Sequence, residues 1–329
     1  MVNVFFAGCD GGDYANIIHD LKTNMLFSYF HSRRNFLKNP KIKEKYPKAD
    51  MIFIDSGAFS AKTLKKNIDL DEYIDFCKKT DADFYAVYDV IGDGDKTRIN
   101  QDYMEKQGVN PVPCFHWGDD MKHLDYYCEN YDFIALGGMV GNVGQVKSWL
   151  EVIFSKYPDQ KFHGFGLTSA DMIRLFPWYS VDSSSWLMGS RTGTLWMMDM
   201  GSLHYDELDR NTQRANLFKD KLLELDMEIS EIKTSYMLRC KFNAIHYGKL
   251  SEVSNKKFKP VQNALSVFFD SDKPKNKIVE SSKNDFYSND KEKKLDIDMT
   301  EIRKGAIRLE FEGISDKGVE AMFKQRFGE

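Results

Sequence analysis

Short apolar runs alternate with segments of helical periodicity over the first 186 residues of the chain. Most of the runs are continuous and rich in β-branched and aromatic residues, which is typical of parallel strands buried on both faces. The pattern predicts eight strands, at residues 2–7, 25–30, 51–54, 84–88, 111–115, 133–136, 161–165 and 179–181.

The segments between these strands carry apolar residues at helical spacing. Residues 71–79 place Tyr73, Ile74 and Cys77 on one face, and residues 143–157 show the same spacing. Eight such units predict an α/β fold, a (β/α)8 TIM-like barrel of parallel strands. An open doubly wound sheet would give a similar pattern.

The pattern changes near residue 200. We therefore divide the chain into a barrel catalytic domain, residues 1–200, and a mostly helical C-terminal extension, residues 201–329. The extension contains a charged, helix-prone stretch (204–228), two apolar segments expected to pack on the barrel (242–250 and 261–269), a polar linker near 271–294 and a terminal amphipathic helix (315–327).

Composition and charge exclude several classes of protein. Hydrophobic residues make up 42% of the 329 residues, which is too many for a disordered chain. The formal charge of −4 argues against a strongly basic nucleic-acid coat. Residues 33–48 hold seven Lys or Arg against one acid. This segment could be a phosphate-binding patch, or a solvated helix face.

The cellular setting is also constrained by the sequence. No apolar run approaches the ~20 residues of a membrane helix, and the first residues lack the layout of a signal peptide. Five scattered cysteines do not form a disulfide framework. We expect a cytoplasmic protein that does not bind a membrane, in a host cytoplasm if the chain is encoded by a phage.

Polar residues and glycines follow five of the predicted strands. In a (β/α)8 barrel the carboxyl ends of the strands carry the active site. Any one of these residues could instead be a helix cap or a turn residue, but the whole set is hard to explain in that way. The set comprises Asp55, Asp89, His116, the pair Gly137 and Gly138, and Asp182.

The motifs around these positions occur in a fixed order over about residues 51–193. They are Asp55-Ser-Gly-Ala-Phe59, Tyr88-Asp89, Val112-Pro-Cys-Phe-His116-Trp-Gly118, Ala135-Leu-Gly-Gly-Met-Val-Gly141, Phe162-His-Gly-Phe-Gly166, Val181-Asp182 and Gly189-Ser-Arg191. The motifs and their order resemble the tRNA-guanine transglycosylase family. They look more like its shorter phage branch, which inserts 7-deazaguanine bases into DNA.

The resemblance implies a base exchange by double displacement. Breaking an N-glycosidic bond builds positive charge on C1′ of the sugar, which a carboxylate can trap while a second acid protonates the leaving base. By resemblance, Asp182 is the nucleophile and Asp55 is the carboxylate that transfers the proton. Guanine in DNA would be replaced by a free 7-deazaguanine base, with 7-cyano-7-deazaguanine as first choice.

The resemblance also implies a set of base-binding residues. Asp89 stands at the position that accepts from N1–H and the exocyclic amine of the base. Backbone N–H groups at Gly137 and Gly138 could donate to O6, because no Cβ blocks the approach. His116 stands where the family commonly has a Gln that contacts the base.

Two further positions match residues that sandwich the base, and one matches a residue near the nucleic-acid backbone. Phe59 and His163 correspond to the two walls of the base site, although each could instead be a buried core residue. Arg191 corresponds to the arginine near the backbone of the substrate. A base in a duplex would have to be extruded to reach such a site.

The chain departs from the family in its cysteines. The tRNA-acting enzymes carry a Cys-x-Cys-x-x-Cys cluster and a distant His, whereas here Cys240 is the only cysteine after Cys128 and His246 is the nearest histidine. Two ligands do not make a four-ligand zinc site. We therefore predict no metal and no other cofactor, and we favour DNA over tRNA as the partner. The extension could hold a second copy of the chain or a partner protein.

Three alternatives stay open. The protein could be a tRNA-acting relative without zinc, a catalytically inactive barrel that binds nucleic acid, or an unrelated barrel enzyme such as a glycosidase. Two carboxylates at strand ends argue against an inactive barrel, because binding alone does not require both Asp55 and Asp182. The glycine pair and Asp89 are not required by glycosidase chemistry.

Overall fold

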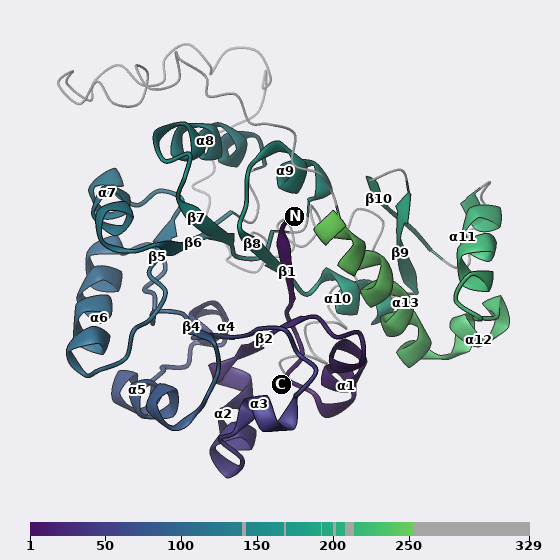
Figure 1. Cartoon of the computed structure of the whole chain (residues 1–329), viewed down its shortest axis with the longest axis horizontal. Helices are drawn as coiled ribbons and strands as arrows, with labels where there is room; N and C mark the ends of the chain where they lie inside the picture. Colours follow the sequence, from purple (N-terminus) through teal and green to yellow (C-terminus); the bar gives the residue numbers. More distant parts are fainter. Residues whose placement is uncertain (140–142, 168, 192, 200–201, 208–213, 253–329) are drawn as a thin grey trace, which may run out of the picture.

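The computed structural model describes residues 1–139, 143–167, 169–191, 193–199, 202–207 and 214–252 (Figure 1). Eight short strands form one parallel sheet in the order β4-β3-β2-β1-β8-β7-β6-β5. The strands are β1 (Asn3–Phe6), β2 (Asn24–Ser28), β3 (Ile52–Asp55), β4 (Phe84–Tyr85), β5 (Cys114–His116), β6 (Phe133–Gly137), β7 (Lys161–Gly164) and β8 (Ser180–Ser183). Each of the eight predicted strands is therefore confirmed, within a few residues at its ends.

The two edge strands of this sheet meet and close it. Ala86 and Val112 form an isolated parallel bridge between the chain after β4 and the chain before β5. The N–H of Val87 donates to the Val112 carbonyl at 2.9 Å, and the N–H of Val112 donates to the Tyr85 carbonyl at 2.7 Å. The predicted (β/α)8 barrel is confirmed. It closes between the regions of β4 and β5, which this one bridge joins.

Helices alternate with the strands and surround them on the outside (Figure 1). The predicted helices at 71–79 and 143–157 are present at Leu70–Lys79 and Val143–Lys156. Several helices begin at a side-chain cap: Asp69 accepts from the N–H of Glu72, a contact worth about 1 kcal/mol. The barrel helices are α1 (Gly12–Asp20), α2 (Tyr29–Lys38), α3 (Ile42–Lys45), α4 (Ala58–Thr63), α5 (Leu70–Lys79), α6 (Gly94–Lys106), α7 (Met121–Asn130), α8 (Val143–Lys156), α9 (Ala170–Leu175) and α10 (Ser185–Arg191).

Aromatic side chains fill the inside of the barrel. Phe5 and Phe53 meet edge to face with ring centroids 5.8 Å apart, and Phe84 and Phe133 are 5.3 Å apart. The ring of His163 lies in the same layer, 5.0 Å from that of Phe53. The interior is thus a packed core, which forms a rigid floor beneath the residues at the carboxyl ends of the strands.

The described part of the extension has its own small core. It consists of the antiparallel hairpin β9 (Thr194–Asp199) and β10 (Ser202–Glu207), the helices α11 (Arg214–Leu223), α12 (Ile229–Thr234) and α13 (Tyr236–Gly248), and the short 3-10 turn η1 (Lys249–Glu252). These elements bury Leu195, Met197, Phe218, Leu222, Met227, Ile232 and Phe242 against one another. The extension therefore begins at β9, a few residues before the predicted boundary.

Part of the helical prediction for the extension is wrong. Residues 204–207 are a strand, because they pair with β9, and the helix begins only at Arg214. The prediction that 242–250 packs on the barrel is confirmed, since the ring of Tyr247 contacts that of Phe6 at 6.4 Å. The predicted segments 261–269, 271–294 and 315–327 lie outside the described residues.

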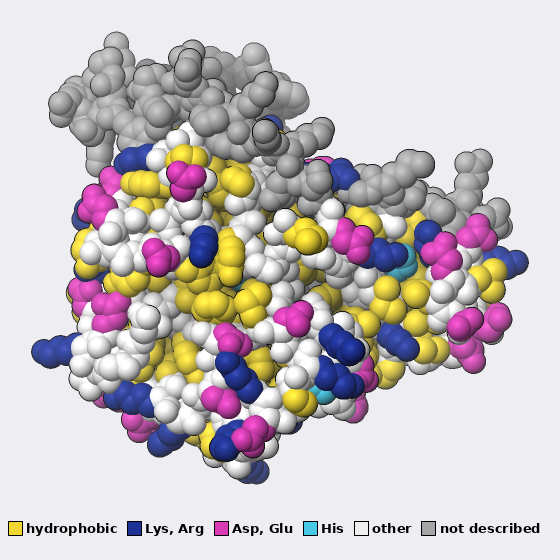
Figure 2. All heavy atoms as spheres, in the orientation of Figure 1, with side chains coloured by type: hydrophobic (Ala, Val, Ile, Leu, Met, Phe, Trp, Pro, Cys, Tyr) yellow, Lys and Arg dark blue, Asp and Glu magenta, His cyan; other side chains and the backbone are white. Residues whose placement is uncertain are grey.

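Charged side chains of both signs are interspersed over the face shown in Figure 2, and neither sign covers it. Within the described ranges, no helix is both long enough and apolar enough to cross a bilayer.

Candidate active site

Carboxylates from three strands meet at the carboxyl end of the barrel. Asp55 ends β3, Asp182 is the third residue of β8, and Asp89 follows β4 by four residues. Burial raises the pKa of the Asp55 carboxyl well above its usual range, and the charges of Asp89 and Asp182 raise it further. Asp55 therefore keeps its proton at pH values where an exposed Asp would be ionised, as a proton donor must.

A sharp turn positions Asp55 and presents the next aromatic residue. The N–H of Gly57 donates to Oδ2 of Asp55 at 3.0 Å. Gly57 has a φ of +79°, and a Cβ added there would lie 2.4 Å from Cβ of Phe30. Only glycine fits this turn without strain. Beyond it α4 begins, and Phe59 in its first turn is 68% exposed.

The donors to Asp182 that the described residues supply contact one of its oxygens. Its Oδ1 accepts from the N–H of Gly166 at 2.9 Å and from Nε2 of His163 at 3.2 Å. The side chain is 9% exposed, so it still reaches the surface at the carboxyl end of the barrel. Hydrogen bonds from N–H groups stabilise an ionised carboxylate.

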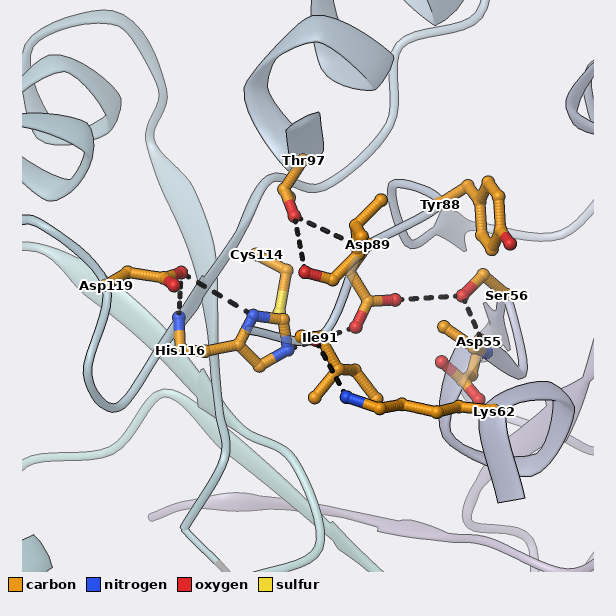
Figure 3. A network of polar contacts seen from close by, with 12 residues as sticks. Asp55, Ser56, Lys62, Tyr88, Asp89, Ile91, Thr97, Cys114, His116 and Asp119 are labelled. Carbon is orange, nitrogen blue, oxygen red and sulfur yellow. Dashed lines mark hydrogen bonds and ion pairs between the residues drawn. The ribbon is translucent and has the colours of Figure 1, made fainter. Parts of the chain in front are cut away.

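Asp89 and His116 form a second polar cluster next to Asp55 (Figure 3). Oδ1 of Asp89 accepts from the hydroxyl of Ser56 at 3.0 Å, and Oδ2 lies 3.0 Å from Nε2 of His116. Asp119 lies on the other side of the ring, where its Oδ2 accepts from the backbone N–H of His116 at 3.0 Å. His116 is thus held between two carboxylates.

The electrostatics of this cluster favour a charged His116. Burial alone lowers the pKa of the imidazole, but its interactions with Cys114, Asp119 and Asp89 outweigh that effect and raise it well above 6.5. The ring is only 6% exposed. An imidazolium here neutralises part of the negative charge that Asp89 and Asp119 would otherwise place in one small volume.

Two glycines allow β6 to approach this cluster closely. A Cβ on Gly137 would lie 2.6 Å from Cδ2 of His116, so a larger residue would displace the ring. Gly138 has a φ of +74°, and a Cβ there would lie 3.2 Å from the backbone nitrogen of Trp117. The structure therefore brings together Asp89, His116 and the glycine pair, all predicted as base-binding residues.

The described residues include one group that could hold a metal ion. Asp89, Cys114 and His116 each place one ligand atom within 4.8 Å of the others. A metal would require a deprotonated thiol and a free imidazole nitrogen. Burial raises the pKa of the Cys114 thiol, and Nε2 of His116 already faces Asp89 at 3.0 Å. The geometry fits a hydrogen-bonded ion pair better than a metal centre.

Cys240 and His246 are the residues nearest to the zinc ligands that the resemblance would imply. Both lie on α13, and they face different partners. Nδ1 of His246 accepts from the N–H of Met198 at 3.2 Å, whereas the Cys240 thiol interacts with Tyr236 and Ser190. Residues that could complete a four-ligand set with them are not found in the described part of the chain.

The structure corrects the predicted role of His163. Its side chain is completely buried, and its ring is covered by Phe53 at 5.0 Å and Phe165 at 4.7 Å. A base cannot stack on a ring that lies inside the barrel below Asp182. Trp117, which follows β5 and is 37% exposed, is an aromatic residue that the sequence prediction missed. Its position directly after a strand end was the available signal.

Arg191, predicted to lie near the nucleic-acid backbone, contacts the extension in the structure. It ends α10, and its Nε is 3.5 Å from the hydroxyl of Tyr236 on α13. The ring of Tyr236 packs against that of Tyr14 on α1, so Arg191 lies at the contact between barrel and extension. A cation that sequence reasoning missed is Lys62, which donates to the Ile91 carbonyl at 2.9 Å (Figure 3).

Two lysines of residues 33–48 form ion pairs away from this site. Lys43 pairs with Asp83, and Lys48 pairs with Asp20. Asp83 immediately precedes β4, and Asp20 ends the helix that leads into β2, so these pairs lie at the amino end of the barrel. The structure favours the interpretation of this segment as a solvated surface with local ion pairs.

No protein-family model matches the chain, and no curated protein matches it as a relative. The resemblance to guanine transglycosylases therefore depends on the strand-end motifs and on the geometry of the residues within them.

Proposed function

We propose that the protein is a DNA-guanine transglycosylase, a pentosyltransferase that exchanges guanine in DNA for a 7-deazaguanine base. The observation that carries the proposal is the pairing of two unlike carboxyl groups at the carboxyl end of one barrel. Burial and two neighbouring carboxylates raise the pKa of Asp55, whereas Asp182 accepts hydrogen bonds from Nε2 of His163 and the backbone N–H of Gly166.

In the first displacement Asp182 attacks C1′ of the target nucleotide. The bond from C1′ to the base nitrogen breaks, its electron pair goes to the base, and Asp55 supplies the proton that makes free guanine. The product is a glycosyl ester of Asp182. In the second displacement ionised Asp55 takes the N–H proton of the incoming base, whose nitrogen then bonds to C1′ as the ester bond breaks. Two inversions restore the original configuration.

Asp89 is suited to recognise the edge of the base. Each of its oxygens already accepts one hydrogen bond, from Ser56 or His116, and each retains a further acceptor site. N1–H and the exocyclic amine of guanine are matching donors, and they are also present in 7-deazaguanines. This explains how one site can bind both the leaving and the incoming base.

The choice of DNA as substrate is supported by two features. The zinc ligands of the tRNA-acting enzymes have no counterpart among the described residues, and the strand-end motifs are more similar to the phage branch. Exposed Phe59 and Trp117 offer flat surfaces for unstacked bases. The target nucleotide would be extruded from a duplex, or would already be single-stranded.

A base-exchange assay tests the proposal. Purified protein is incubated with labelled 7-cyano-7-deazaguanine and with duplex DNA, single-stranded DNA or tRNA, and the nucleosides are then analysed by mass. We expect label in DNA, none in tRNA, and none with Asp182→Asn. Label in tRNA alone would identify a zinc-less tRNA enzyme. Binding of the free base without incorporation into any substrate would favour an inactive barrel.

A further inference from the structure

Two completely buried polar side chains lie directly beneath Asp182. Nδ1 of His163 is 2.8 Å from the hydroxyl oxygen of Ser180, and Nε2 is 3.2 Å from Oδ1 of Asp182. The strand register places His163 opposite Ser180, and Ser180 and Asp182 share one face of β8 because they are two residues apart. The three side chains therefore form a short hydrogen-bonded chain from the core to the surface.

The hydrogen-bond partners define where the protons lie. A carboxylate oxygen only accepts hydrogen bonds, so Nε2 of His163 carries a proton, and the hydroxyl of Ser180 can then donate to Nδ1. Aromatic rings on several sides enclose the imidazole, including Phe5 at 5.8 Å and Phe165 at 4.7 Å. The ring is held in one orientation, with its N–H directed at Asp182.

Both donors to Asp182 contact the same oxygen. Gly166 and His163 each donate to Oδ1, at 2.9 Å and 3.2 Å. Among the residues that the structure describes, none donates to Oδ2. One oxygen is therefore occupied, whereas the other keeps its lone pairs for a new bond.

We propose that His163, held by Ser180, is a positioning residue that makes Oδ2 of Asp182 the oxygen that bonds to C1′. This inference rests on the proposed base exchange. In the second displacement the C1′–Oδ2 bond breaks and its electron pair returns to the carboxylate. A hydrogen bond to Oδ1 is stronger for the carboxylate than for the ester, so His163 makes Asp182 a better leaving group. Without this donor the covalent ester should accumulate.

Four variants test this role. His163→Leu removes the donor, and His163→Gln replaces it with an amide that can also donate. Ser180→Ala leaves the imidazole but removes the hydroxyl that holds it. Phe133→Leu is the matched control, because Phe133 contacts the ring of His163 at 6.3 Å and makes no bond to Asp182. Exchange rates are measured with labelled base. The fraction of protein joined covalently to DNA is measured by intact mass after acid quenching.

We expect His163→Leu to lower kcat about 10- to 100-fold with little change in KM for the base, and to raise the covalent fraction. His163→Gln should restore most of the rate, Ser180→Ala should give a smaller change in the same direction, and Phe133→Leu should match the wild type. If His163→Leu does not fold, Ser180→Ala compared with Phe133→Leu decides the question.

Two results would overturn the inference. One is an active wild type whose His163→Leu or Ser180→Ala variant has an unchanged rate and covalent fraction. The other is a Phe133→Leu variant that reproduces their effects, since packing alone would then explain them. Failure of the proposed function gives a different result, because the wild type would then incorporate no base and form no covalent product.

Discussion

Oδ2 of Asp89 and Nε2 of His116 lie 3.0 Å apart, across the seam where the barrel closes. The backbone joins the β4 and β5 regions through a single isolated bridge, between Ala86 and Val112. The side-chain pair therefore connects two segments that few other hydrogen bonds connect. One pair of residues thus both closes the sheet and forms part of the candidate base site.

Because the pair has both roles, we expect two of its variants to differ in how strongly they affect base affinity and stability. Asp89→Ala removes the acceptor for the base and leaves His116 with only Asp119, so both base affinity and stability should fall. His116→Gln keeps a hydrogen-bond donor for Asp89. We expect it to lower the free energy of unfolding by about 2 kcal/mol and base affinity by less than Asp89→Ala does. Urea unfolding and equilibrium binding of 7-cyano-7-deazaguanine measure the two effects. Equal base affinity in wild type and Asp89→Ala would contradict the recognition role.

The pH dependence of this stabilisation has a definite sign. The pKa of His116 is raised in the fold, so its contribution is fully present below the unfolded value of about 6.5. It is lost as the pH rises through the folded value. The stability difference between wild type and His116→Gln should therefore shrink from pH 6 towards alkaline pH. A difference that grows over this range would show that His116 is neutral in the fold.

Asp55 should determine how the rate of base exchange falls as the pH rises. The first displacement needs its proton, so the release of guanine should fall as the pH rises through the raised pKa of this carboxyl. Asp55→Asn should lower the rate about 10²- to 10⁴-fold and abolish this fall with pH. Single-turnover release of labelled guanine from DNA, measured between pH 5 and 9, tests this prediction.

The same substitution should stabilise the fold. Because the pKa of Asp55 is raised, its charged form is disfavoured in the folded state, and this cost appears as the pH rises above the ordinary value of 3.8. Asp55→Asn is neutral at every pH, so it should unfold at higher urea concentration than wild type at pH 7. A less stable variant would indicate that the carboxylate, and not the acid, is the form that the fold favours.

Because the ring of His116 lies directly against Gly137, we expect Gly137→Ala to weaken base binding. The new Cβ would lie 2.6 Å from the imidazole ring, which Asp89 and Asp119 hold from both sides. We expect KM for the incoming base to rise about tenfold, corresponding to about 1.4 kcal/mol. Gly12→Ala is the matched control, because nothing lies within 4 Å of a Cβ at that position. Wild-type KM in Gly137→Ala would show that the position of His116 does not affect binding.

The sequence predicts the strands and the strand-end carboxylates well, because both follow from local pattern. Continuous apolar runs define the strands, and Asp55 and Asp182 stand at or near their carboxyl ends. The local sequence does not reveal how deeply the side chain of His163 is buried. This depth depends on the register that pairs His163 with Ser180, two residues before Asp182, which places its ring one layer below the surface. The motif Phe162-His-Gly-Phe-Gly166 gives no sign of this.

Long-range packing explains the other differences. Arg191 ends α10, and its side chain lies against Tyr236, which is 45 residues further along the chain. Residues 204–207 form a strand because β9 is available to pair with them, although their charge and composition favour a helix. Contacts between distant segments decide both outcomes, and a single sequence does not reveal them.

His246 should make the extension sensitive to acid. It lies on α13, only 1% exposed, and Nδ1 accepts from the N–H of Met198 on β9. Burial, with smaller effects from Lys249 and Lys221, lowers its pKa to about 4. Protonation would break the bond to Met198 and bury a charge, so the fold favours the neutral ring.

The sign of this effect follows from the lowered pKa. The stabilisation is fully present above the unfolded value of 6.5 and is lost as the pH falls towards about 4, by up to about 3 kcal/mol. His246→Gln offers a carbonyl that can accept from Met198 but cannot titrate, so its unfolding free energy should change less between pH 7 and 4.5. Parallel slopes for wild type and His246→Gln would mean that other groups cause the acid sensitivity.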